Sequence, residues 1–114
     1  MGNDCIFCKI RDGEIAGEIL YRNNHCLVIR DIAPQAPVHL LVIPNIHFTF
    51  LSDLTSEEHD MIGAMFSAAK EVAAGEKVDI SGYRLVINQG ANSGQIVDHL
   101  HLHLLGGQPL GNMC

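Results

Sequence analysis

The chain has 114 residues, and at ~100 to 200 residues per domain we expect residues 1–114 to form a single domain. Apolar residues make up 47% and charged residues 18%, which is the balance of a globular protein rather than of a disordered chain. Seven Lys and Arg against 13 Asp and Glu give a net charge of −6, which repels polyanions and argues against a nucleic-acid polymer as partner.

The sequence predicts a cytoplasmic protein with no membrane partner. No apolar run approaches the ~18 residues that a membrane span needs, and residues 1–5 lack the basic-then-apolar order of a signal peptide. In a reducing compartment cysteines are thiols or metal ligands rather than disulfides. This expectation applies to Cys5, Cys8, Cys26 and Cys114.

The first half of the chain predicts three strands. Ile19 to Arg22 and His25 to Arg30 flank Asn23-Asn24, a spacing that is typical of a short antiparallel hairpin. A proline-rich segment, which cannot lie inside a sheet ladder, then leads into a third strand from Val38 to Ile43. Pro44 ends that strand.

The middle of the chain predicts one main helix, from about Thr55 to Ala74. Thr55 and Glu58 have the spacing of a capping box. We expect Gly75 to end the helix, because glycine best tolerates a left-handed cap. Apolar residues recur at steps of three and four, namely Met61, Ile62, Met65, Phe66, Ala69, Val72 and Ala73.

The last third predicts two further strands, Tyr83 to Asn88 and Asp98 to Leu105, joined by a loop rich in Gly and Asn at 89–94. Together with the first three strands they make a five-stranded antiparallel sheet. The fold class is therefore α+β, with one main helix on the sheet.

Histidines and leucines alternate strictly from His99 to Leu104, so a strand there puts three imidazoles on one face. With a rise of ~3.3 Å per residue, neighbouring histidines start ~6.6 Å apart and the outer two ~13 Å apart. Because zinc lies ~2 Å from imidazole nitrogen, neighbours can share an ion, whereas His99 and His103 can do so only where His101 stands. The three histidines should therefore divide their tasks.

The alternative is that these are core histidines satisfied by main-chain groups or water. A buried polar group without a partner costs ~1–3 kcal/mol. Three histidines on one face of a strand therefore favour a bound polyanionic ligand or a metal ion over an unliganded core. Imidazole is a nucleophile when neutral, as it mostly is at a pKa of ~6.5. Protonated neighbours can hold phosphate oxygens, and the Gly94-Gln95 turn can add main-chain N–H groups. Phosphorus is the natural electrophile for this set.

These residues resemble the histidine triad (HIT) family, and within it the Hint branch of nucleoside phosphoramidases. The resemblance covers nearly the whole chain. It rests on Ile6-Phe7, residues 31–44, Asn88, Gly94-Gln95, residues 99–105 and residues 105–111.

The resemblance implies a homodimer whose two sheets join into one, with no catalytic cofactor. It implies a two-step reaction on purine nucleoside monophosphates that carry an amine on phosphorus. His101 matches the family's nucleophile, which holds the nucleotidyl group until water releases it. His103 matches a phosphate contact. His39 matches a fourth histidine, which helps to order the three histidines of the strand, His99 among them.

The resemblance also implies the nucleotide contacts. Asp31 matches a carboxylate that accepts both ribose hydroxyls, and Asn88 matches a polar group beside the leaving group. Read without the resemblance, Asp31 is a turn residue, Asn88 and Gln95 close a loop, and the apolar residues are core. The remaining expected contacts are Phe7, Ile10, Ile32 and Val97 around the base and Gly94, Gln95 and Ile96 in the loop.

Two positions depart from the family pattern. Ile96 stands where the family carries a small hydroxyl residue that bonds phosphate or the leaving-group nitrogen, which puts the turnover rate and the preferred leaving group in question. Asp98 replaces an aromatic residue before the histidines. We expect Asp98 to point to the leucine side, in a structural or interfacial role.

Cys5 and Cys8 form a C-x-x-C pair, which supplies two of the four ligands of a zinc site. The resemblance suggests His47 and His99 as the other two, in a structural zinc site that leaves the nucleophile free of metal. The alternative is a pair of idle thiols. We assign no role to His25 and His59.

The sequence thus favours a purine nucleoside phosphoramidase. A dinucleoside polyphosphate hydrolase of the same family would use the same histidines with a phosphate leaving group. A third reading is a nucleotide-binding or zinc-stabilised scaffold of low activity.

Overall fold

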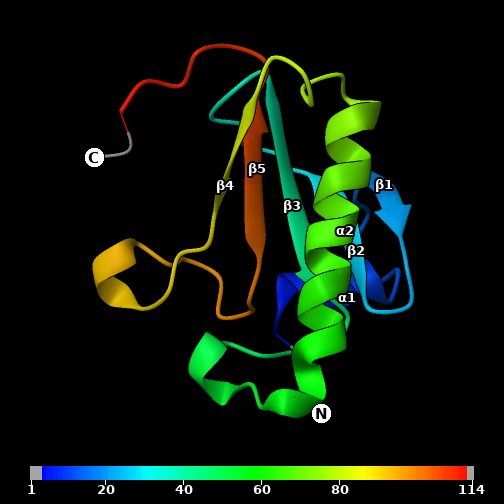
Figure 1. Ribbon diagram of the computed structural model, residues 1–114. Coiled ribbons are helices and arrows are strands. Elements are labelled where there is room, and N and C mark those ends of the chain that lie inside the picture. The colour runs from blue at the N-terminus through cyan, green and yellow to red at the C-terminus, as the bar shows by residue number, and fades with distance from the viewer. Residues whose placement is uncertain (1–3, 113–114) are drawn as a thin grey trace.

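The structure, a computed structural model, describes residues 4–112. One antiparallel sheet carries a long helix on one face and a short helix on the other (Figure 1). The strands are β1 (Ile19–Arg22), β2 (Cys26–Arg30), β3 (Val38–Pro44), β4 (Tyr83–Val86) and β5 (Leu102–Gly106), in the order β1-β2-β3-β5-β4. The helices are α1 (Ile6–Arg11) and α2 (His59–Gly75), with 3-10 turns at Leu51–Asp53, Ser56–Glu58 and Ala91–Ser93. The predicted α+β class is confirmed.

The β1–β2 hairpin is confirmed, and its turn depends on one side chain. The Asn23 carboxamide oxygen accepts the main-chain N–H groups of His25, at 2.8 Å, and Cys26, at 2.9 Å. An Asx turn of this kind replaces hydrogen bonds that the chain reversal removes from the ladder. It fixes the start of β2, whose residues are buried from Cys26 to Ile29.

The main helix begins later than predicted. Thr55 and Glu58 do form the capping box, with Glu58 Oε1 accepting the Thr55 N–H at 2.7 Å, but the box starts a 3-10 turn and α2 follows at His59. Gly75 is the last helical residue, and the left-handed conformation falls instead on Lys77, at φ 62°. The buried residues of the helix are Met61, Met65, Ala68, Ala69, Val72 and Ala73.

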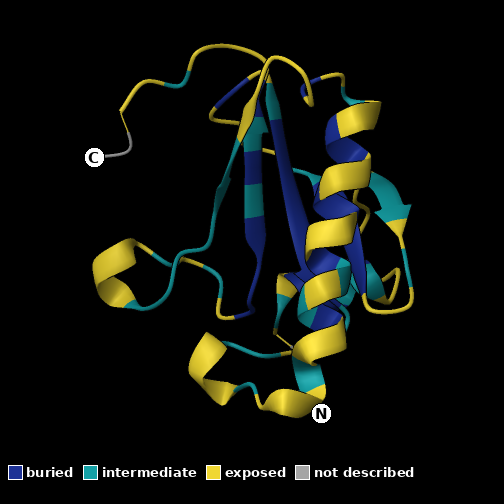
Figure 2. Ribbon diagram, viewed as in Figure 1, coloured by how far each residue is buried: buried dark blue, intermediate teal, exposed yellow. Residues whose placement is uncertain are grey.

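One predicted core position of α2 is wrong. Phe66 is 48% exposed, whereas Ala68 is buried. Both residues fit a spacing of three and four, but they lie about 200° apart around the helix, so only one of them can face the sheet. Figure 2 shows the resulting division of α2 into a buried inner side and an exposed outer side.

The short helix α1 is a feature that we did not predict. It buries Phe7, Cys8 and Ile10 at helical spacing, and Lys9 and Arg11 lie in its last turn, where cations favour the helix dipole. A periodic pattern of six residues is too short to distinguish a helix from a strand.

The last two strands are shorter than predicted. β4 ends at Val86, before Asn88, and β5 begins at Leu102, so that His99 and His101 precede the ladder. The partner of β5 is β3, which ends at Pro44, and the last pair between them is Val42 with Leu102. Residues 99–101 therefore lie outside the ladder, although β3 itself continues for two residues beyond that pair.

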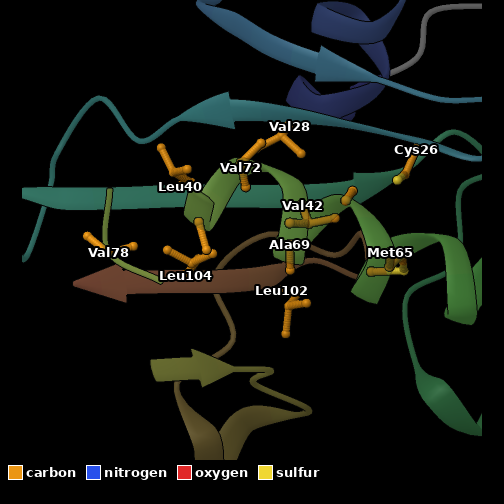
Figure 3. Packing of buried hydrophobic residues seen from close by; sticks show 12 residues of the cluster. Cys26, Val28, Leu40, Val42, Met65, Ala69, Val72, Val78, Leu102 and Leu104 are labelled. Carbon is orange, nitrogen blue, oxygen red and sulfur yellow. The ribbon is translucent and has the colours of Figure 1, made fainter. Parts of the chain in front are cut away.

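Buried apolar residues form two clusters, one on each face of the sheet. The cluster under α2 consists of Cys26, Val28, Leu40, Val42, Met65, Ala68, Ala69, Val72, Ala73, Val78, Leu102 and Leu104 (Figure 3). The cluster under α1 consists of Phe7, Ile10, Leu27, Ile29, Leu41 and Ile43. Alternate residues of β2 and β3 thus belong to opposite clusters, as the period of two requires.

Within residues 4–112 no helix combines the length and the apolar character needed to cross a membrane.

Candidate active site

The histidines collect on the α1 face of the sheet. His103 lies on β5 opposite Leu41, and His39 lies two residues earlier on β3. The ring of His101 lies 4.9 Å from that of His103, centre to centre, and 5.1 Å edge-on from Phe7 of α1. Helix α1 therefore covers the nucleophile candidate from one side while β5 supports it from the other.

These side chains border a cavity of about 270 Å³. Of the residues predicted to bind a nucleotide, the cavity wall contains Phe7, Ile10, Asp31, Ile32, Asn88, Gly94, Ile96, Val97, His101 and His103. Gln95 is not part of the wall. Residues that we did not predict as site residues also line it, namely Ile6, Ile29, Arg30 and Leu41.

Two of these omissions had a signal in the sequence. Ile29 and Leu41 alternate with residues of the α2 cluster, so they had to face the other side of the sheet. Nothing in the sequence indicated what that side would cover. Ile6 lines the cavity because α1 is helical, which the sequence did not predict.

His101 is held in a single tautomer by a main-chain carbonyl. Its Nδ1 lies 2.7 Å from the His99 carbonyl oxygen, and because a carbonyl can only accept, Nδ1 carries the proton. In the neutral ring Nε2 then has the lone pair. The side chain is 7% exposed. An imidazole in this state can act as a nucleophile without first losing a proton.

His103 is held in the opposite tautomer by a chain of two hydrogen bonds. The Gln35 N–H donates to His39 Nδ1 at 3.0 Å, so the neutral His39 ring carries its proton on Nε2. His39 Nε2 lies 2.9 Å from His103 Nδ1 and donates to it. The His103 proton is therefore on Nε2, where it can serve as a hydrogen-bond donor.

Both of these histidines are neutral at pH 7. Burial lowers the pKa of His103 to about 4, helped by the nearby rings of His101 and His39 and opposed by Asp31. Burial also lowers the pKa of His39, again against the pull of Asp31. We had expected protonated neighbours to hold phosphate oxygens. The structure instead provides an uncharged N–H donor, because desolvation outweighs the single carboxylate.

Asp31 is partly engaged inside the protein. Its Oδ1 accepts the Ala33 N–H at 2.8 Å, as in an Asx turn, and its Oδ2 lies 3.4 Å from His39 Nε2. Each carboxylate oxygen can accept a further hydrogen bond. The residue thus closes a turn and at the same time lines the cavity.

Asp31, His39 and His103 also bring three ligand-type atoms within 4.8 Å of one another. The Gln35 N–H works against a metal at this place. Since it occupies the lone pair of His39 Nδ1, the Nε2 proton cannot move there, and Nε2 has no lone pair to offer.

The loop before the histidines is closed by Gln95. The Gln95 carboxamide accepts the Gly90 N–H at 2.8 Å and donates to the carbonyls of Thr49, at 3.3 Å, and Val97, at 3.2 Å. We had expected the Gly94-Gln95 turn to offer main-chain donors. The Gly94 and Gln95 N–H groups are instead used within the turn, on Ala91 and Gly90.

The next two main-chain amides are available. Among residues 4–112, the N–H groups of Ile96 and Val97 donate to no other group, and both residues line the cavity. The main-chain donors that remain available beside the cavity are therefore those of residues 96 and 97 rather than 94 and 95. Asp98, which follows, is exposed and outside the strand, so the alternation that we used to orient it does not apply.

A second cluster of polar side chains lies beside the first. The Sγ atoms of Cys5 and Cys8 and a ring nitrogen of each of His47 and His99 all lie within 4.8 Å of one another. His99 donates its Nε2 proton to the Pro44 carbonyl at 3.0 Å, which leaves the Nδ1 lone pair facing the sulfurs. The cluster joins the N-terminus of α1 to the segment before β5.

This donor set fits zinc. Zn–S of ~2.3 Å and Zn–N of ~2.0–2.1 Å at tetrahedral angles place S and N ~3.6 Å apart. The sulfur-to-Nδ1 distances are 3.2 Å from Cys5 to His99, 3.7 Å from Cys8 to His99 and 3.4 Å from Cys8 to His47. Burial raises the pKa of the Cys5 thiol, and a bound cation would reverse this because the thiolate is the ligand.

The fold and the site define a class: a small α+β protein in which two neighbouring histidines, His101 and His103, border a cavity lined by apolar and polar residues. The HIT domain model matches residues 12–110. The chain belongs to the HIT family, as the resemblance predicted.

Similar proteins span nearly the whole chain. A purine nucleoside phosphoramidase of Escherichia coli strain K12 is 42% identical over 113 residues, which are 99% of this chain and 95% of that protein. The crystal structure of a HIT family hydrolase from Legionella pneumophila has a TM-score of 0.91 at 41% identity and covers 95% of this chain and 96% of its own. A histidine triad protein from Clostridium difficile has a TM-score of 0.91 at 38% identity, with 98% of both chains covered.

Proposed function

We propose that this protein is a purine nucleoside phosphoramidase that hydrolyses adenosine 5'-monophosphoramidate-type P–N bonds through a nucleotidyl-His101 intermediate. Family membership and the 42% identity to a purine nucleoside phosphoramidase support an enzyme that hydrolyses nucleotides. The observation that carries the finer proposal is the 2.7 Å contact between His101 Nδ1 and the His99 carbonyl, which leaves a lone pair on Nε2.

In the first step the lone pair of His101 Nε2 attacks the α-phosphorus and forms a P–N bond. The bond from phosphorus to the amine breaks, and its electron pair leaves with the amine nitrogen, which takes a proton. The phosphoryl oxygens gain charge during this step. The His103 Nε2–H and the amides of Ile96 and Val97 are donors beside the same cavity, suited to stabilise that charge.

In the second step water attacks the same phosphorus. The bond to His101 breaks, its electron pair returns to Nε2, and the nucleoside monophosphate is released with one proton going to solvent. His101 thereby regains the tautomer that it started with, because the proton stays on Nδ1 throughout and is donated to the His99 carbonyl oxygen. No cofactor is required for either step.

The apolar residues of the cavity wall suit the nucleoside part of the substrate. Phe7, Ile10 and Ile29 supply apolar surface for a base, and Ile32, at 94% exposure, has most of its surface available to a guest. Asp31 retains acceptor capacity for the ribose hydroxyls. Asn88 stands with Gly94 and Ile96 on the cavity wall, where the resemblance puts the leaving group.

We also propose that Cys5, Cys8, His47 and His99 hold a structural zinc ion. Bound there, zinc would tie α1 to the segment that carries His101, and it would leave the nucleophile uncoordinated. A homodimer joined sheet to sheet and a cytoplasmic location belong to the same proposal; the family resemblance supports the first and the sequence supports the second.

Intact mass after rapid quench tests the proposal. Mixed with an adenosine phosphoramidate, the protein should gain the mass of one adenylyl group, and peptide mapping should place it on His101. Comparison with a diadenosine polyphosphate separates this activity from that of a dinucleoside polyphosphate hydrolase. No adduct and no turnover with either substrate, together with normal AMP binding by His101→Ala, would establish a nucleotide-binding scaffold instead.

A further inference from the structure

The cavity wall carries an apolar side chain that the proposed mechanism does not use. Ile96 is 91% exposed, although large apolar side chains tend to be buried. It lines the same cavity as His101 and His103. A solvent-exposed apolar side chain beside a binding cavity makes apolar contacts only when a ligand binds and covers it.

The position of Ile96 is fixed rather than accidental. The Gln95 carboxamide is bound to Gly90, Thr49 and Val97, which holds the loop on both sides of residue 96. Gln95 therefore points into the loop and Ile96 stands out at the cavity. Its neighbours on the wall include Gly94 and Asn88.

None of these neighbours can protonate a departing amine. The Asn88 carboxamide and the main-chain amides donate hydrogen bonds but do not give up a proton at neutral pH. Ile96 has no polar side-chain atom. The neutral ring of His103 and the guanidinium of Arg30, which also line the cavity, likewise donate hydrogen bonds without giving up a proton at neutral pH, so the departing nitrogen takes its proton from water.

We infer that Ile96 is a specificity-determining residue that selects apolar amines as leaving groups. This inference rests on the proposed function. An apolar amine covers the Ile96 side chain during attack by His101, whereas a hydroxylated amine gains nothing there and its own polar group loses water. Because the proton comes from water, weakly basic amines such as arylamines leave fastest.

Three adenosine phosphoramidates test this, those of aniline, benzylamine and ethanolamine. Benzylamine and ethanolamine have similar basicity, so their ratio of kcat/KM reports apolar contact alone. Since one apolar contact of methylene size is worth at least ~10-fold in discrimination, we expect benzylamine to be favoured by about 10-fold or more. Aniline should react faster than benzylamine.

Ile96→Ala and Ile96→Ser should each bring the benzylamine-to-ethanolamine ratio to within about 2-fold of unity. Ser should in addition raise the absolute rate with ethanolamine relative to Ala, because it restores a hydroxyl donor. Ile80→Ser is the matched control, since Ile80 is 93% exposed and does not line the cavity. That variant should keep the wild-type ratio.

A wild-type ratio near unity, or the same ratio in wild-type and Ile96→Ala proteins, would overturn the inference. The covalent adduct keeps this failure distinct from failure of the proposed function. Adenylylated His101 with an unselective ratio leaves the phosphoramidase standing without this role for Ile96, whereas the absence of an adduct with all three substrates overturns both.

Discussion

The two faces of the sheet are made of the same strands but are used differently. On the α2 face every cluster member is apolar and at most 6% exposed. On the α1 face the apolar cluster is smaller, and His39, His99 and His101 are buried beside it. One side of each strand thus supplies the stability that lets the other side keep buried polar groups and a cavity.

This difference predicts which changes affect chemistry and which affect folding. Substitutions under α2 should lower the free energy of unfolding and leave the site's chemistry intact in the folded fraction. Substitutions of the histidines should impair the chemistry of the site and change the free energy of unfolding little. The following experiments are ordered from the largest expected effect to the smallest.

His101→Ala should lower kcat/KM by at least about 10³-fold, because it removes the nucleophile. It should also abolish the adduct seen by intact mass. The thermal unfolding midpoint should change little, since within residues 4–112 the ring makes one hydrogen bond and packs against the rings of Phe7 and His103. His25→Ala, an exposed histidine without a role, is the control. Full activity of His101→Ala would refute the assignment.

Leu104→Ala should lower the free energy of unfolding by about 2–5 kcal/mol, because it leaves a cavity in a fully buried position under α2. Chemical denaturation measures this. Phe66→Ala on the exposed side of α2 should cost much less. Equal losses for the two variants would show that the α2 face does not carry the stability assigned to it.

Removal of metal should destabilise the protein by about 3 kcal/mol if zinc is present at ~100 times its dissociation constant. We expect one zinc per chain by mass spectrometry of the metal content, and none in a Cys5→Ser, Cys8→Ser double variant. Cys26→Ser, at a buried cysteine under α2, should retain its zinc. Equal metal content in all three proteins would contradict the site.

His39→Leu should lower kcat by about 10- to 100-fold, somewhat less than the ~10²–10³ that loss of a whole oxyanion donor costs. It breaks the chain from the Gln35 N–H to His103, so the His103 proton is no longer confined to Nε2. His39→Gln should restore much of the activity, because a carboxamide can accept and donate at the same two places. If Gln fails as Leu does, His39 acts by another route, such as proton transfer.

Acid should destabilise the α1 face first. The folded-state pKa of His103, about 4, lies below the ordinary value of 6.5. Between these values the unfolded chain binds more protons than the folded protein, so the free energy of unfolding should fall as pH decreases from about 6.5 towards 4. Calorimetry across this range should show a shallower dependence for His103→Gln than for wild type. An unchanged slope would mean that His103 is not buried in the neutral form.

The structural elements that could be predicted from the sequence are those marked by a strict alternation of residue types or by specific turn and cap residues. The alternation of leucine and histidine placed Leu100, Leu102 and Leu104 in the core and the histidines opposite them. The hairpin at Asn23 followed from turn chemistry. The capping box at Thr55 was also correct, although the sequence did not show that a 3-10 turn would intervene.

The parts that could not be predicted depend on neighbours distant in the chain. β5 begins only at Leu102, where its pairing with β3 starts, although the alternating pattern extends back to His99. Three predictions were wrong in detail: Phe66 as a core residue, Gly75 as a left-handed cap, and the Gly94-Gln95 turn as a source of main-chain donors. In each case the local pattern fits the predicted and the observed arrangement equally well. Contacts between elements decided between the alternatives. The expectation that Cys114 is a thiol or a metal ligand falls on a residue outside those that the structure describes.

The sequence by itself determined the order of the elements and the inventory of reactive groups, because periodicity and turn chemistry act over a few residues. Only the tertiary structure decided the protonation of those groups. The proton positions on His101 and His103 are set by the His99 carbonyl and, through His39, by the Gln35 amide. The His39–His103 hydrogen bond crosses the sheet and depends on where two strands meet. The contacts of His101 with His99 and of Gln35 with His39 join near neighbours in the chain, but they need a main-chain geometry that the residue pattern does not specify.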